Sequence, residues 1–121
     1  MSAVRALRGA TTIDEDTPEE IGRRVRTLLQ EMLARNGAGK EDLISVLFTA
    51  TDDIHSAFPA TPARDIGFGD VPLICARELD IVGGKPRCIR VMMHLTTDRA
   101  RGELHHVYLE GARDLRDDLP E

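Results

Sequence analysis

Aromatic side chains are almost missing from this sequence, which has no tryptophan, one tyrosine and three phenylalanines in 121 residues. Proteins that bind bases or sugars by stacking rely on such rings, so this mode of binding is not expected. Basic residues are not in excess either, and the net charge of −5 argues against unspecific binding to nucleic acid or anionic membranes. No apolar run approaches the ~20 residues of a membrane span, and the first residues lack a signal-peptide core. A cytoplasmic location is the expectation.

The residues of common catalytic and metal sites are also few. The only cysteines, Cys75 and Cys88, form no C-x-x-C motif and are expected to be free thiols. The histidines show no metal-ligand spacing and are interpreted as surface or packing residues: His55, His94, His105 and His106. Neither a nucleophile elbow nor a glycine-rich phosphate loop occurs. We therefore expect no metal and no cofactor, and an enzyme of this composition would use chemistry that needs neither nucleophile nor metal.

The hydrophobic pattern predicts one α+β domain over residues 1–121, with a polar, flexible tail from about residue 117. The clearest element is an amphipathic helix within residues 17–37, where Thr17 and Glu20 fit a capping box and Asn36 and Gly37 a C-terminal stop. About five strands of a mixed sheet are predicted at residues 4–13, 42–51, 71–81, 87–95 and within 102–116. Residues 52–70 are expected to form a loop with short helical turns. One long helix leaves part of the sheet uncovered, which favours oligomerisation.

Arg90 lies in the middle of the apolar segment "RCIRVMMHL". Strand alternation places Ile89, Val91, Met93 and Leu95 on a core face and Arg90 on the opposite face. A guanidinium cannot lose its proton, so Arg90 needs an acidic partner or an anionic ligand. Glu78, before the turn at residues 82–86, is the obvious internal partner across a hairpin. The residues alone leave both interpretations open.

A resemblance adds to this interpretation. The segments "VRALRGATTIDEDTPEEI", "ATDDIHSAFPATPAR", "VPLICARELDIVGG", "CIRVMMH" and "HHVYLEGARDLRDDL" resemble the AroH-class monofunctional chorismate mutases over nearly the whole chain. The resemblance implies a cofactor-free Claisen rearrangement of chorismate to prephenate, in phenylalanine and tyrosine biosynthesis. It also implies a homotrimer of pseudo-α/β-barrel form, with active sites at the subunit interfaces.

Roles for single residues follow from the same resemblance. It implies that Arg8 and Tyr108 bind a substrate carboxylate, that Arg90 donates to the ether oxygen, that Glu78 accepts from the ring hydroxyl, and that Cys75 lies near that hydroxyl. Further substrate-binding residues are implied at the walls and the C-terminal cover of the site: Phe58, Arg64, Leu73, Ile74, Leu115 and Arg116.

Three features depart from the family pattern. Ile74 stands where a small polar residue is common, Thr61 replaces a basic residue of some relatives, and the loop "DIGFGD" is one residue shorter. Cys75 and Glu78 also have opposite parity, so a shared pocket would require the strand to bulge or end between them. A non-catalytic trimer that binds a dicarboxylate is the alternative function. A trimeric imine or enamine hydrolase of Rid-type architecture has no supporting motif beyond the arginine.

Overall fold

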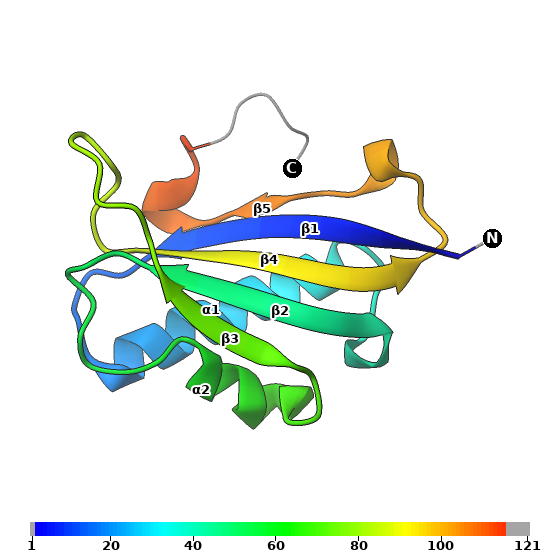
Figure 1. Cartoon of the computed structure of the whole chain (residues 1–121), viewed down its shortest axis with the longest axis horizontal. Helices are drawn as coiled ribbons and strands as arrows, with labels where there is room; N and C mark the ends of the chain where they lie inside the picture. Colours follow the sequence, from blue (N-terminus) through cyan, green and yellow to red (C-terminus); the bar gives the residue numbers. More distant parts are fainter. Residues whose placement is uncertain (1, 116–121) are drawn as a thin grey trace.

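The computed structural model describes residues 2–115, which form one five-stranded sheet with its helices on one side (Figure 1). The elements follow the order β1 (Ala3–Thr12), α1 (Pro18–Ala34), η1 (Lys40–Asp42), β2 (Leu43–Ala50), α2 (Ala60–Ala63), η2 (Arg64–Phe68), β3 (Leu73–Arg77), β4 (Cys88–Thr97), η3 (Arg101–Glu103), β5 (Val107–Tyr108) and η4 (Glu110–Ala112). The predicted α+β class and mixed sheet are confirmed.

The strands lie in the order β3-β2-β4-β1-β5. β4 is antiparallel to both β1 and β2, whereas β1 pairs with β5, and β2 with β3, in parallel. The predicted hairpin between the third and fourth strands is wrong, because β2 lies between them. The last predicted strand is also wrong in length: β5 has two residues, and the 3-10 turns η3 and η4 flank it.

α1 packs on the sheet through the apolar stripe that its periodicity predicts. Ile21, Val25, Leu28, Leu29 and Met32 are fully buried. They meet the core face of β4, where Ile89, Val91, Met93 and Leu95 are buried as strand alternation predicts. Figure 1 shows α1 and α2 on the same side of the sheet.

The ends of α1 follow the predicted signals, with one exception. Thr17 caps the helix, and its Oγ1 accepts from the backbone N–H of Glu20 at 3.1 Å. Gly37 follows the last turn with a φ of +59°, a conformation that favours glycine. The reciprocal half of the capping box is not formed, because Glu20 turns to Arg23, Arg24 and the N–H of Asp14.

The opposite side of the sheet carries neither α1 nor α2, and we call it the open face; η4 reaches only the part of it where Ala112 packs with Ala10 and Cys88. It presents alternate residues of three strands: Val4, Ala6, Arg8 and Ala10 of β1; Leu47 and Thr49 of β2; and Arg90, Met92 and His94 of β4. Val4 and Leu47 are exposed hydrophobic residues on this face. An exposed apolar sheet face supports the expectation of an oligomer.

Candidate active site

A hollow of about 210 Å³ lies on the open face where β1, β2 and β4 run side by side. Four of the predicted site residues line it together: Arg8, Glu78, Arg90 and Tyr108. Arg8 and Arg90 come from the strands themselves, Tyr108 from β5, and Glu78 from the residue after the end of β3. Two fixed cations beside a tyrosine form a surface suited to a small anion.

Arg90 and Glu78 form an ion pair across the hollow. Arg90 Nε lies 3.0 Å from Glu78 Oε2, yet this N–H makes no hydrogen bond to any residue between 2 and 115. The two charges therefore attract each other in a geometry that leaves the guanidinium donor misaligned. The internal pair inferred from the sequence is present, and the Arg90 side chain as a whole is still 42% exposed on the open face.

Thr49 explains how Glu78 reaches Arg90 although β2 separates their strands. In the sheet register Thr49 is directly opposite Arg90, and its hydroxyl donates to Glu78 Oε2 at 2.9 Å. The backbone N–H of Glu78 donates to the carbonyl oxygen of Ala50 at 3.0 Å. The carboxylate is thus held over β2 and aimed at β4. Sequence reasoning missed Thr49, although Thr49 shares its strand parity with another polar residue, Ser45, which indicates the face opposite the core.

Other predicted residues lie elsewhere on the chain. Phe58 and Cys75 line a second hollow of about 470 Å³ at the β3 edge, which shares no lining residue with the first. Phe58 is 71% exposed and Ile74 64%, Arg64 is exposed, and Leu73 is half-buried. Leu115 packs beside Tyr108 and Ala112, and Arg116 is outside the described residues. One chain therefore presents two separate groups of predicted site residues.

The parity problem between Cys75 and Glu78 has a simple answer in this arrangement. β3 ends at Arg77, just before Glu78, and Cys75 packs toward the core while Glu78 lines the open face. No bulge is needed, since the two side chains occupy different hollows. Burial raises the pKa of the Cys75 thiol above its usual 9.0, so it stays protonated near neutral pH. Both cysteines are free thiols, as predicted.

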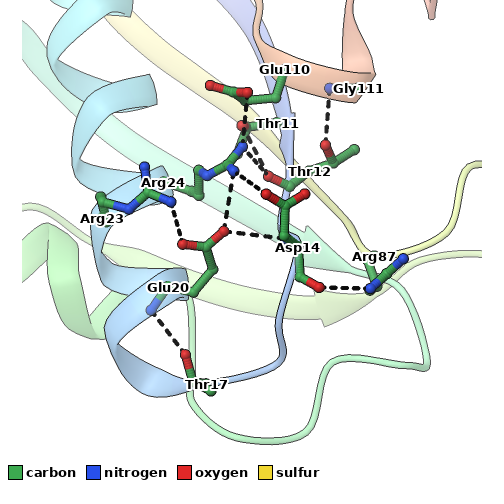
Figure 2. Close-up of polar contacts among 10 residues, drawn as sticks. All are labelled: Thr11, Thr12, Asp14, Thr17, Glu20, Arg23, Arg24, Arg87, Glu110 and Gly111. Atoms are coloured by element: carbon green, nitrogen blue, oxygen red, sulfur yellow. Dashed lines mark hydrogen bonds and ion pairs between the residues drawn. The ribbon is translucent and has the colours of Figure 1, made fainter.

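Arg24, which sequence reasoning placed on a solvated helix face, is 7% exposed and joins three elements (Figure 2). Its guanidinium donates to the carbonyl oxygen of Thr12 at 3.1 Å and pairs with Asp14, Glu20 and Glu110 at 2.9, 3.2 and 3.1 Å. Glu110 has a φ of +54° and begins the turn that follows Tyr108 and Leu109. Arg24 therefore fixes the backbone just beyond a predicted site residue.

We expect Arg24→Met to lower the free energy of unfolding by about 2 kcal/mol, because it removes a buried charge with several partners. Urea denaturation measures this change. Arg23→Met is the matched control: Arg23 is exposed and, among residues 2–115, pairs with Glu20 alone, so a loss below about 0.5 kcal/mol is expected. Equal losses in both variants would contradict the assigned role of Arg24.

The N–H of Asp14, with Arg23 and Arg24, lowers the pKa of Glu20 below its usual 4.5. The contribution of the Glu20 carboxylate to the free energy of unfolding is therefore present above pH 4.5 and is lost as the pH falls through the lower pKa of the folded state.

Among residues 2–115, no cluster of three histidine, cysteine or acidic side chains is placed to hold a metal ion. Nor is any helix in that range long and apolar enough to cross a membrane. The fold and the hollow define a class: an α+β protein with an arginine-lined hollow on a sheet face that α1 and α2 leave uncovered.

Comparison with known proteins narrows this class to one family. The family model described as chorismate mutase type I matches residues 4–119. The chorismate mutase AroH of Thermus thermophilus is 50% identical over 117 residues, 96% of each chain. AroH of Bacillus subtilis (strain 168) is 43% identical over 117 residues, 96% of this chain and 92% of the relative. A solved chorismate mutase from Clostridium thermocellum superposes with a TM-score of 0.88 at 45% identity, over 89% of this chain and 96% of that one. The chain belongs to the chorismate mutase type I family.

Proposed function

We propose that this protein, a chorismate mutase, converts chorismate to prephenate as a homotrimer, at sites that form where two subunits meet. The observation that carries the proposal is the convergence of Arg8, Glu78, Arg90 and Tyr108 on one hollow of the open face. Membership of the family and identities of 43% and 50% to the AroH enzymes support the reaction.

The reaction is an intramolecular rearrangement in which a C–O bond breaks as a C–C bond forms, so no acid, base or nucleophile is required. The protein has to hold the substrate dianion in its compact reactive conformer. It also has to stabilise the charge that develops on the ether oxygen. Fixed guanidinium groups suit both tasks, since they donate several hydrogen bonds and never lose their charge.

Each residue of the hollow takes one part of this task. Arg8 and Tyr108 bind a carboxylate from the β1–β5 side, and Arg90 donates to the ether oxygen from β4. Glu78 accepts from the ring hydroxyl. Arg90 helps the transition state more than the ground state, because the oxygen becomes more negative as the bond breaks.

The second group of residues completes the site from a neighbouring subunit. Phe58 and Cys75 line the hollow at the β3 edge, away from the hollow of the open face, and Arg64, Leu73 and Ile74 belong to the neighbouring η2 and β3. If one substrate contacts both groups, they must come from two chains. A head-to-tail contact of this kind closes into a ring, and a trimer gives one site per interface. Leu115 and Arg116 would cover the bound substrate.

The decisive test is the loss of chorismate absorbance when purified protein is added. We expect turnover without added metal or cofactor, and formation of prephenate verified by its acid-catalysed conversion to phenylpyruvate. Tight binding of chorismate in calorimetry with no turnover would instead identify a non-catalytic dicarboxylate-binding protein of the same fold.

A further inference from the structure

The backbone of Arg8 is held by a histidine side chain. The Arg8 N–H donates to Nδ1 of His106 at 3.0 Å, across 98 residues of sequence. This contact is unusual because it occurs where a sheet normally continues through backbone pairs. His106 itself is half-buried and lies directly before β5.

The short length of β5 explains why a side chain is needed. The β1–β5 pairing covers Gly9 with Val107 and Ala10 with Tyr108, so Arg8 lies just beyond it. The carbonyl oxygen of His105 accepts from Asn36 Nδ2 at 2.9 Å and is turned toward α1. The imidazole of His106 therefore supplies the acceptor for the Arg8 N–H just beyond the end of the β1–β5 pairing.

We propose that His106 is a positioning residue for Arg8: its Nδ1 continues the β1–β5 pairing by one residue and so fixes the backbone from which the Arg8 guanidinium reaches the substrate carboxylate. The inference rests on the proposed function for the identity of that carboxylate. The geometric part, the hydrogen bond between His106 and Arg8, stands by itself.

The ring must be neutral to play this part, since an imidazolium has a proton on Nδ1 and cannot accept. His106 lines a hollow of about 690 Å³ on the open face together with basic side chains of three elements: Arg5 and Arg8 of β1, His94 of β4 and Arg101 of η3. No acidic residue from the described part of the chain lines this hollow. Burial, and to a smaller extent His105, lower the pKa of His106 below its usual 6.5. These surroundings favour the neutral imidazole, which accepts from the Arg8 N–H, at neutral pH.

Acidification reverses the contact. Below the pKa of His106, Nδ1 becomes a donor that faces the Arg8 N–H, and β1 loses its hydrogen bond at Arg8 on the β5 side while its pairing with β4 remains. Carboxylates ordinarily titrate near pH 4, so the substrate itself loses charge only around that pH. We therefore expect KM to rise as the pH falls through the pKa of His106, with a smaller effect on kcat because Arg90 lies on β4.

Two variants of matched shape test the acceptor. His106→Asn keeps an oxygen where Nδ1 lies, whereas His106→Leu has the same branched shape without an acceptor. For His106→Leu we expect KM to rise about five-fold to ten-fold with kcat within about two-fold, the size of one lost hydrogen bond. His106→Asn should restore KM at neutral pH and abolish the rise in KM at acidic pH. His94→Asn, from the same hollow, should keep that rise.

Amide NMR of the unliganded protein separates this inference from the proposed function. The ¹⁵N–¹H signal of Arg8 should shift with pH along the titration of His106, and the shift should vanish in His106→Asn. An Arg8 amide that ignores the titration, or equal KM defects in His106→Asn and His106→Leu, would overturn the inference. Absence of chorismate turnover with an intact Arg8 titration would overturn the proposed function and leave the contact between His106 and Arg8 established.

Discussion

Replacement of Arg90 by alanine is expected to lower kcat/KM by on the order of 10²-fold or more, equivalent to about 3 kcal/mol of transition-state stabilisation. The physical reason is that Arg90 is a preorganised donor at an oxygen whose charge grows only as the bond breaks. Most of the loss should therefore appear in kcat. Steady-state assays of chorismate disappearance measure it, with circular dichroism to verify that the fold is kept.

One further variant tests whether a positive charge at position 90 is sufficient for the rate, and a second serves as a control. Arg90→Lys keeps a cation but loses the planar fork, so it should recover little of the lost rate. Arg23→Ala removes an exposed arginine of α1 and should leave the rate unchanged. Near-normal activity of Arg90→Ala would refute the role assigned to Arg90.

Mixing two inactive variants is expected to restore activity if each site draws on two subunits. Arg90→Ala damages the hollow on the open face, and Arg64→Glu places a negative charge in the exposed group at the β3 edge, where it repels the substrate dianion. After joint unfolding and refolding at equal amounts, about a quarter of the interfaces in a ring combine two intact halves. We expect up to about a quarter of wild-type activity from the mixture, against almost none from either variant alone.

The control for this experiment is the mixture without refolding, which should stay inactive as long as subunits do not exchange. Light scattering should give about three times the 13.4 kDa chain mass for the wild type and both variants. A monomer with full activity, or a refolded mixture with no recovery in spite of a trimeric mass, would exclude a shared site.

The local parts of the fold could be predicted from the sequence because they depend on near neighbours. The stripe of α1, the Thr17 cap and the two faces of β4 follow from periodicity and spacing. The order of the strands could not be predicted in this way. The assumed hairpin placed Glu78 beside Arg90, and the two do meet, but across β2 and with the help of Thr49.

In the candidate site, too, features that depend on near neighbours could be predicted and those that depend on distant contacts could not. Strand parity was enough to place Arg90 off the core face, because only the alternation of one strand was needed. His106 was interpreted as a surface or packing residue, since nothing in "HHVY" shows that an N–H of Arg8 lies opposite it. Arg24 was assigned to a solvated face because its cover comes from outside the helix, from the end of β1 and from the turn at Glu110, which is far away in the sequence. Residues that act through contacts across 70 or more positions leave little signal in local pattern.

The ion pair between Arg90 and Glu78 has a consequence for ligand choice. Each charge of the pair masks the other, so an incoming ligand competes with a partner already present. On the proposed roles, chorismate offers Arg90 an ether oxygen and gives Glu78 a hydroxyl in exchange. A dicarboxylate without a hydroxyl has no hydrogen-bond donor for Glu78, so Glu78 stays paired with Arg90. On these roles Glu78 competes with an incoming anion for Arg90, and among anions of similar charge those that carry a hydroxyl are favoured.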